Sequence, residues 1–230
     1  EKNHLIVSKE LLDLLSAVEP EPEKEGEIIV SIGNNYVCSV DSEHIAMCNL
    51  ETVLEPLEGY SINLSKLRKL DGAIIERKDD KRFFASSEDF KLHLKSECIS
   101  SKFPTVNLPV KFSTSADKFY QKLEEVAKYM KEDEDKIRTV LFESKPNEAI
   151  EVSPINIDKL EEYAIAKFGK IEAKEEHRCH YRLASLLFAA SKFKGELEVS
   201  FGKDNPIRID FKEPFKGAYM LAPYSIPKEN

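Results

Sequence analysis

Apolar and polar residues alternate along much of this chain, which predicts a protein built largely of short strands. The clearest example is the segment 198–211, where alternating apolar residues stand on both sides of Gly202 and the pair Asp204-Asn205. These residue types favour a tight turn, and Pro206 stands where the turn passes into a strand that tolerates a missing N–H group. The pattern therefore predicts a hairpin over 198–211.

Four shorter segments repeat their apolar residues every three or four positions, which predicts helices instead. Ser8 can cap the first of them, which we expect to run over about 9–18. Ser115 can cap the third, and the second and fourth are expected over 64–70 and 183–193. Strands are predicted before and after each helix.

The order strand, helix, several strands, short helix, hairpin and final strands occurs twice along the chain. The clearest echo is between 60–80 and 181–205, because each segment runs from a tyrosine through a helix and a strand to a Lys-Asp turn. A stretch without a clear period, which carries Pro104 and Pro109, separates the two series and is predicted to be a linker. We therefore predict an α+β fold with two similar halves. The expected divisions are an N-terminal half over 1–96, an interdomain connecting loop over 97–109 and a C-terminal half over 110–230.

No pattern in the sequence indicates catalysis. There is no glycine-rich phosphate loop, no nucleophile elbow and no cluster of Asp, Glu and His at metal-ligand spacing. His177 and His180 flank Cys179, but in a strand the two histidines would point to opposite faces. Paired carboxylates such as Glu161-Glu162 are more simply explained as solvated faces. We therefore expect a protein that is not an enzyme and that has neither a metal site nor a cofactor.

Four short motifs follow one another along the chain. The segment 40–47 reads Val-Asp-Ser-Glu-His-Ile-Ala-Met, and 62–70 opens with Ile-Asn-Leu at the start of a basic helix. Phe103-Pro104 stands in the predicted connecting loop, and the last predicted strand, which begins at Gly217, ends in Tyr-x-Leu-Ala-Pro. In this order and at nearly this spacing, they resemble the proliferating cell nuclear antigen (PCNA) family, the DNA sliding clamps of archaea and eukaryotes. The resemblance covers nearly the whole chain.

The resemblance implies a clamp subunit with outer β-sheets and inner helices. Three copies of the chain, or this chain with paralogous subunits, would close a ring around duplex DNA of any sequence. Such a ring serves as a processivity factor for DNA polymerase and as a docking platform for replication and repair enzymes. The implied partners are a clamp loader and polymerase, nuclease and ligase clients that carry a PCNA-interacting peptide.

In such a ring, basic side chains on the inner helices would attract the phosphate backbone without reading bases. The candidates are Lys66, Arg68, Lys69, Lys118, Lys122, Lys128, Lys192 and Lys194. Alternatively, these residues belong to ordinary solvated faces. The first helix sets Glu10 and Asp13 against one lysine, and the fourth shows Ala184 and Ala189 where the family often has a basic residue. A thin basic lining fits a paralogous subunit that shares its ring with more basic partners, or a scaffold that binds only proteins.

Clients in this family insert a short peptide, with a glutamine and paired apolar residues, into a groove beneath the connecting loop. The matching positions are Val40, His44, Ile45, Phe103, Pro104, Ala222, Pro223, Tyr224 and Ile226. Tyr224 replaces the Lys or Arg that often follows Ala-Pro, which would alter client choice. Val40 and Ile45 could instead be core residues, and His44 a hydrogen-bonded structural residue.

Subunit contacts in the family pair an edge strand at the end of the first half with one near the last helix of the second half. Here the predicted strands are 90–95 and 176–181, and the predicted interface residues are Phe90, Leu92, Leu94, Cys179 and Tyr181. Pairing would hide strand edges that otherwise invite aggregation. Lys91, His93 and Lys95 on one strand could complement Glu175 and Glu176 on the other.

The net charge alone does not favour DNA binding. The 230 residues include 42 acidic and 34 basic side chains, for a net charge of −8, whereas nucleic acid usually recruits a basic surface. A ring with its basic residues inside and its acidic residues outside would remove this objection. The four cysteines lack Cys-x-x-Cys spacing, and no apolar run reaches the ~18 residues of a membrane span. We expect buried reduced thiols, no signal peptide, and a location in an archaeal cytoplasm or a eukaryotic nucleus.

Overall fold

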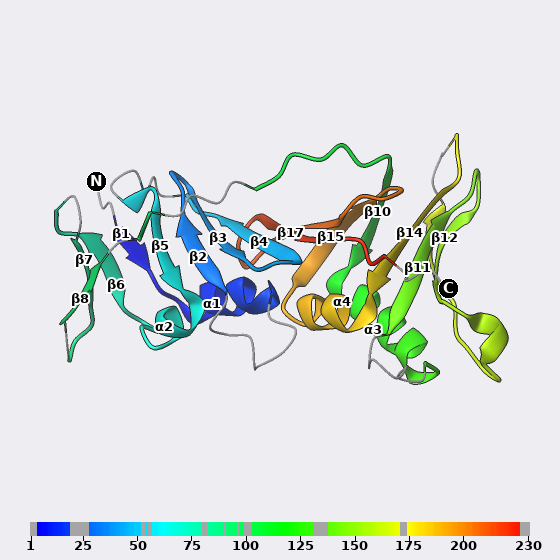
Figure 1. Cartoon of the computed structure of the whole chain (residues 1–230), viewed down its shortest axis with the longest axis horizontal. Helices are drawn as coiled ribbons and strands as arrows, with labels where there is room; N and C mark the ends of the chain where they lie inside the picture. Colours follow the sequence, from blue (N-terminus) through cyan, green and yellow to red (C-terminus); the bar gives the residue numbers. More distant parts are fainter. Residues whose placement is uncertain are drawn as a thin grey trace. The chain divides into compact units, whose positions relative to one another are not determined.

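The computed structural model divides the chain into two compact units (Figure 1). It describes residues 4–18, 28–51, 54, 57–79, 82–89, 91–95, 97–98, 103–130, 138–170 and 174–225. The first unit comprises 1–105 with 214–218, and the second comprises 106–213 with 219–230. The boundary at 218 falls within the last strand, Gly217–Leu221, most of which belongs to the second unit.

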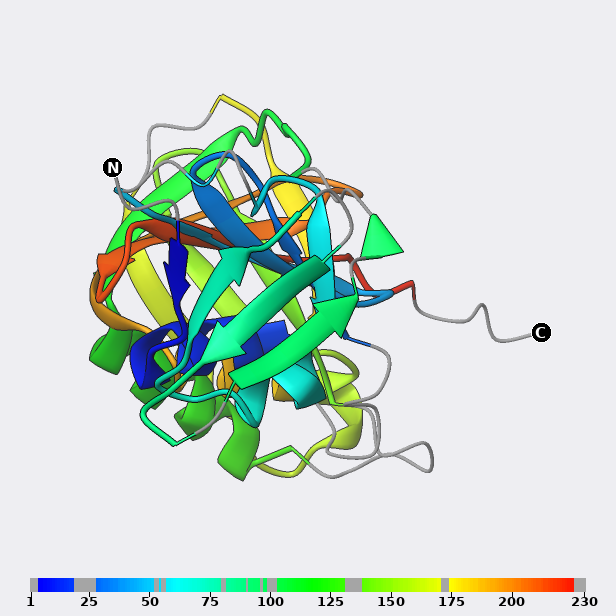
Figure 2. The same ribbon diagram turned by 90° about the vertical axis from the view of Figure 1, so that its left-hand side faces the viewer.

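The first unit contains two antiparallel sheets and two helices. Its elements are β1 (His4–Ile6), α1 (Lys9–Leu15), the 3-10 turn η1 (Ser16–Val18), β2 (Ile29–Ile32), β3 (Tyr36–Val40), β4 (His44–Asn49), β5 (Tyr60–Asn63), α2 (Leu64–Arg68), β6 (Ile74–Arg77), β7 (Arg82–Ser86), β8 (Lys91–Lys95) and β9 (Glu97–Cys98). The sheet orders are β1-β6-β7-β8, onto which Figure 2 looks, and β4-β3-β2-β5-β9. The two helices contact each other, and α1 packs against β4.

The second unit repeats this series of elements. They are β10 (Val110–Ser115), α3 (Ala116–Lys128), β11 (Thr139–Ser144), β12 (Ala149–Pro154), the 3-10 turn η4 (Ile157–Lys159), β13 (Ala166–Lys170), β14 (His177–Arg182), α4 (Leu183–Ala190), β15 (Lys194–Phe201), β16 (Ile207–Glu213) and β17 (Gly217–Leu221). The sheet orders are β10-β15-β16-β17 and β13-β12-β11-β14. The helices α3 and α4 contact each other, as α1 and α2 do.

The local chemistry of the two units is also repeated. Ser8 accepts a hydrogen bond from the Leu11 N–H at the start of α1, and Ser115 accepts one from the Lys118 N–H at the start of α3. Each short helix follows directly on a strand that carries a fully buried tyrosine, Tyr60 or Tyr181. The α+β fold of two similar halves predicted from the sequence is therefore confirmed.

Aromatic rings pack against one another in the core of each unit, and most of the buried ones lie in the second unit. In the first unit, the ring of Tyr60 lies 4.2 Å from that of Phe83, measured between centroids. In the second unit, Phe168 of β13 lies 4.8 Å from Phe112 of β10 and 5.8 Å from Phe119 of α3. These three rings pack α3 against both sheets of its unit, because Phe112 and Phe168 come from different sheets.

The predicted hairpin over 198–211 is present as β15 and β16. Asp204 in its turn has a φ of 56°, a left-handed conformation that Asp tolerates better than most residues. The helices are shorter than expected, since α2 ends at Arg68, α4 ends at Ala190, and the last three residues of the predicted first helix form η1. Helix ends depend on capping contacts that periodicity does not show.

Candidate functional site

Basic residues on α2 differ in what they contact. The leucines of this helix are buried, which leaves Lys66 and Lys69 exposed on its other side. Arg68 is half-buried, and its Nη2 donates a hydrogen bond of 2.8 Å to the Oγ of Ser16 in η1. Arg68 therefore ties α2 to the end of the first helix, while the two lysines extend into solvent.

The three predicted lysines of α3 also have different surroundings. Lys118 is exposed near the start of the helix. The Nζ of Lys122 donates a hydrogen bond to the backbone carbonyl of Lys167 in β13. The Nζ of Lys128 lies 2.8 Å from a carboxylate oxygen of Glu125, one turn earlier. Two of the three side chains therefore make polar contacts within their own unit.

The fourth helix carries no lysine or arginine, since its sequence is Leu-Ala-Ser-Leu-Leu-Phe-Ala-Ala. Both basic residues predicted for it lie after its end. The Nζ of Lys192 is 5.1 Å from the centroid of the Phe188 ring, and Lys194 is the exposed first residue of β15. Ala184 is exposed and Leu187 half-buried, so this helix presents apolar rather than basic side chains.

Acidic side chains further dilute the positive charge of the helices. The exposed members are Glu10 and Asp13 on α1, and Asp117, Glu124 and Glu125 on α3. They equal in number the exposed lysines of the helices and their ends, which are Lys9, Lys66, Lys69, Lys118 and Lys128. The exposed charges of the helices are therefore balanced in number, and Lys66, Lys69 and Lys118 are among the exposed cations.

Two of the predicted groove residues, Val40 and Ile45, are brought together as cross-strand partners in the ladder of β3 and β4. Both are half-buried in the first unit. The turn between them is closed by Asp41, whose Oδ1 accepts hydrogen bonds from the N–H groups of Glu43 at 2.7 Å and His44 at 2.8 Å. Such a turn fixes the register of the strands on which Val40 and Ile45 stand.

The imidazole of His44 makes a third contact with the same carboxylate oxygen, at 2.6 Å from its Nδ1. A carboxylate can only accept, so Nδ1 must carry the proton. Burial acts to raise the pKa of Asp41, but the hydrogen bond and charge of His44, together with the two backbone N–H groups, outweigh it and lower that pKa. Because His44 is only 4% exposed, the structure favours the alternative that it is a structural residue of the turn.

The C-terminal groove residues belong to the second unit. Ala222 is exposed, whereas Pro223 and Tyr224 are half-buried. The N–H of Tyr224 donates a hydrogen bond of 2.8 Å to the His180 carbonyl, and the Arg182 guanidinium lies 5.2 Å from the centroid of the Tyr224 ring. Pro223 and Tyr224 also line an open pocket of about 730 Å³. The tail therefore runs along β14 of its own unit.

In the connecting loop, Phe103 is half-buried and Pro104 is exposed. Both belong to the first unit. Ile226, the last residue predicted for the groove, lies outside the described residues. The union of the two sets of groove residues in one site stays a prediction.

The predicted subunit-interface residues differ in how exposed they are. Leu92 on β8 is 42% exposed, whereas Phe90 and the side chain of Leu94 lie outside the described residues. Cys179 and Tyr181 are buried, and the Tyr181 hydroxyl donates a hydrogen bond of 2.7 Å to the Asn205 carbonyl. Burial, reinforced by Cys179, raises the pKa of Tyr181. The side chains of Cys179 and Tyr181 therefore belong to the core of the second unit.

The sheet topology indicates which strand edges are open. β8 ends one sheet of the first unit, and β13 ends one sheet of the second. At the opposite end of the latter sheet, β14 pairs with β11 on one side and accepts the hydrogen bond from Tyr224. Among the described residues, each edge of this sheet therefore accepts a hydrogen bond from its own unit, β14 from the backbone of the tail and β13 from the side chain of Lys122.

Solved structures similar to this chain share one architecture. PCNA of A. fulgidus, solved with the C-terminal region of FEN-1 bound, matches with a TM-score of 0.69 and 15% identity, over 98% of this chain and 99% of that one. This chain has the sliding-clamp fold. No protein-family model and no curated protein sequence matches it.

Bacterial sliding clamps are similar as well. The clamp of Bartonella birtlesii bound to griselimycin matches with a TM-score of 0.69 and 18% identity, and that of C. crescentus with 0.67 and 15%. Each match covers 97% of this chain and 65% of the bacterial one. The chain therefore spans about two-thirds of the length of these bacterial clamps.

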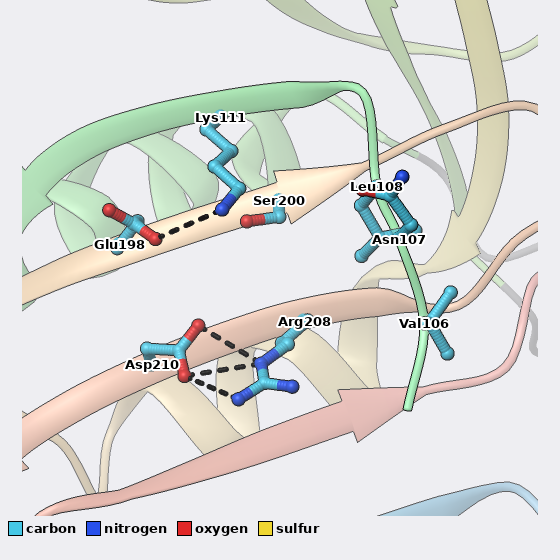
Figure 3. Close-up of a pocket in the computed structure, with 8 residues that line it drawn as sticks. All are labelled: Val106, Asn107, Leu108, Lys111, Glu198, Ser200, Arg208 and Asp210. Atoms are coloured by element: carbon cyan, nitrogen blue, oxygen red, sulfur yellow. Dashed lines mark hydrogen bonds and ion pairs between the residues drawn. The ribbon is translucent and has the colours of Figure 1, made fainter. Parts of the chain in front are cut away.

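A hollow of about 300 Å³ lies on the sheet of the second clamp unit, beside the segment 106–108 (Figure 3). Lys111 points toward Glu198, with 3.9 Å between the Nζ and a carboxylate oxygen. Arg208 forms an ion pair with Asp210, and its Nη2 lies 2.9 Å from the carboxylate. Since each cation faces a carboxylate, this surface has polar groups without an excess of one charge. No motif in the sequence marks this surface, although the alternation that predicts the hairpin places Glu198, Arg208 and Asp210 on one face.

Few other reactive groups are present in the part of the chain that the structure describes. Within it, no group of three or more His, Cys, Asp or Glu side chains could hold a metal ion, and no helix is long and apolar enough to cross a membrane. Cys38, Cys48 and Cys179 are buried and free. Burial raises the pKa of Cys38 to about 12 and that of Cys48, with a further effect of Cys38, to about 12. Cys38 and Cys48 therefore stay protonated at neutral pH.

Proposed function

We propose that this chain is a subunit of a ring-shaped DNA sliding clamp. In that role it encircles duplex DNA, holds a DNA polymerase on its template and serves as a docking platform for other replication and repair enzymes. The sliding-clamp fold, which extends over 98% of the chain, carries this proposal. The clamp acts through its shape and its surfaces rather than through catalysis, and it works in the compartment that contains the DNA, after opening by a clamp loader.

The ring would close through the open strand edges of the two units. β8 of one copy would pair with β13 of the next, because β14 already bonds to the backbone of its own tail, whereas β13 accepts a bond from the side chain of Lys122. The exposed Lys91 and His93 of β8 would face the exposed Glu161 and Glu162, which precede β13. Three copies closed in this way leave neither edge unpaired.

Within the ring, the helices would face the DNA. Lys66 and Lys69 of α2 and Lys118 of α3 would contact phosphates through charge alone, which permits sliding along any sequence. Few cations per subunit release few counterions, so we infer weak binding with a shallow dependence on salt. Encirclement, rather than affinity, would then keep the protein on DNA.

Clients would dock through a short peptide that carries apolar anchors. The exposed Ala222 and half-buried Pro223 offer an extended backbone with small apolar side chains, a surface suited to such a peptide. The similar archaeal clamp was solved with the C-terminal region of FEN-1 bound, which supports the binding of client peptides here.

A comparison of circular and linear DNA tests encirclement. The purified protein is incubated with a nicked circular plasmid, and with the same plasmid cut once, before gel filtration at increasing salt. The proposal predicts retention on the circle and loss from the linear form, because a ring slides off free ends. Equal retention on both forms would contradict encirclement by this chain alone.

Charge reversal on α2 provides a paired variant for that experiment. Lys66→Glu with Lys69→Glu should reduce retention on the circle at low salt, since both side chains are exposed on the helix proposed to face DNA. Lys203→Glu with Lys212→Glu makes the same change in net charge at exposed positions of the second unit, in the hairpin turn and in β16. This control should bind as the unmodified protein does, so an equal loss in both variants would argue against the helical DNA face.

A second candidate function is a subunit of a mixed ring, or a clamp-like scaffold that binds only proteins. The acidic side chains exposed on α1 and α3, and the absence of any Lys or Arg from α4, favour it. Retention on circular DNA only after a more basic clamp subunit is added would support the mixed ring. If no DNA is retained with or without added clamp subunits, the result would favour the scaffold that binds only proteins.

A further inference from the structure

The edge of β13 is an exposed strand edge flanked by apolar side chains. Among the described strands, β13 pairs with β12 alone and ends the sheet. Ile165, directly before it, is 39% exposed, and Tyr163 is 44% exposed. An edge with unpaired backbone groups beside apolar side chains is a site where another strand can add. Proteins commonly protect such edges, often with lysine.

Lys122 of α3 provides a contact of this kind. Its Nζ lies 2.5 Å from the carbonyl oxygen of Lys167, in the middle of β13, and 4.7 Å from the centroid of the Phe168 ring. The donor and acceptor are 45 residues apart in sequence, so this is a tertiary contact rather than a local cap. A charged donor makes a stronger hydrogen bond than a neutral one, and the aromatic face adds attraction for the ammonium.

We propose that Lys122 is a gate on the edge of β13. Its ammonium occupies a backbone acceptor that an incoming strand would use, and it must swing away before that strand can pair. The gate would make the isolated subunit less prone to associate with unrelated strands. It would also weaken ring closure, because the strand of the next copy must displace the same hydrogen bond. This inference rests on the proposed ring, since it concerns how the ring interface is regulated.

The strand that the gate admits is β8 of a second copy. β8 ends its own sheet, so it presents the complementary row of backbone groups. Leu92 of β8 is 42% exposed and can cover Ile165 or Tyr163 on pairing. The exposed Lys91 brings positive charge to the acidic pair Glu161-Glu162, which discriminates against an acidic strand.

Lys122→Met tests the gate, because methionine keeps a long apolar side chain over Phe168 but cannot donate to the carbonyl. Lys118→Met is the matched control, one turn earlier on the same helix and exposed. The probe is a labelled synthetic peptide of residues 88–98, which spans β8, titrated against each full-length protein. Removal of a charged hydrogen bond should tighten binding of the peptide by about fivefold in the Lys122 variant, while the control stays within about twofold of the unmodified protein.

Lys122→Arg keeps a charged donor and should bind the peptide as the unmodified protein does. Thermal unfolding of each variant checks that the second unit is intact. Equal peptide affinity in the Lys122→Met and Lys118→Met proteins, including no binding by either, would overturn the gate.

Self-association, measured by sedimentation on the same proteins, separates the gate from the ring. If the unmodified chain assembles and Lys122→Met assembles no better than the control, the gate fails while the ring stands. If no protein self-associates but the peptide binds Lys122→Met more tightly, the ring of identical copies fails while the gate stands.

Discussion

Asp41 shows how one side chain can fix a turn that supports a larger surface. Its carboxylate holds the N–H groups of Glu43 and His44 and the imidazole Nδ1, all through one oxygen. The sequence carries a local signal for this turn, because Asp favours bonds to nearby backbone amides. It left open whether His44 faces a client or the core, because burial depends on residues that pack from elsewhere in the fold.

Asp41→Asn should cost about 1–3 kcal/mol of the free energy of unfolding at pH 7, because three hydrogen bonds lose a charged acceptor. The pKa of this carboxyl is lowered in the folded protein. Its contribution is therefore present above the unfolded pKa, near 3.8, and is lost as the pH falls through the lower folded value. Urea unfolding at pH 7 and at successively lower pH measures the difference.

The difference between the two proteins should shrink toward zero in acid. Ser42→Ala, in the exposed centre of the same turn, is the control and should change stability by less than about 0.5 kcal/mol. An equal cost for Asp41→Asn at every pH would mean that the carboxylate charge is not what stabilises the turn.

At the scale of elements, the sequence predicted strands, hairpins and caps well because their signals are local. The turn residues of the β15–β16 hairpin and the serine caps of α1 and α3 act within a few residues. It could not predict which cations would face solvent. The acceptor of Arg68 is 52 residues away in sequence and that of Lys122 is 45 residues away, so only tertiary structure shows that these side chains are occupied.

The aromatic cluster under α3 gives a test at this scale. Phe119 is fully buried against Phe168, and Phe119→Ala should cost about 3–5 kcal/mol through lost burial and the cavity that remains. Amide hydrogen exchange should rise in α3, β10 and β13 more than in β2 and β3 of the first unit. Gln121→Ala, exposed on the same helix, should leave exchange nearly unchanged. A larger rise in the first unit would contradict the description of two compact units.

At the scale of the molecule, the doubled order of elements was visible in the sequence because each unit repeats the same alternation and the same caps. The strand that pairs with a neighbouring subunit was harder to assign. The strand 176–181 stays a prediction for this contact, but β14 is flanked by β11 and bonded to Tyr224 of the tail. Since that bond joins segments 44 positions apart, spacing along the sequence could not show it.

The mass of the protein in solution is the most direct test of the proposed ring. Light scattering on the purified chain, over a range of concentration and at low and high salt, gives that mass without reference to any partner. A ring of identical subunits predicts a stable species of about three times the 26.3 kDa of one chain. A mass of one chain at every concentration and salt would contradict a self-sufficient ring, and the partner would then be sought among other clamp subunits.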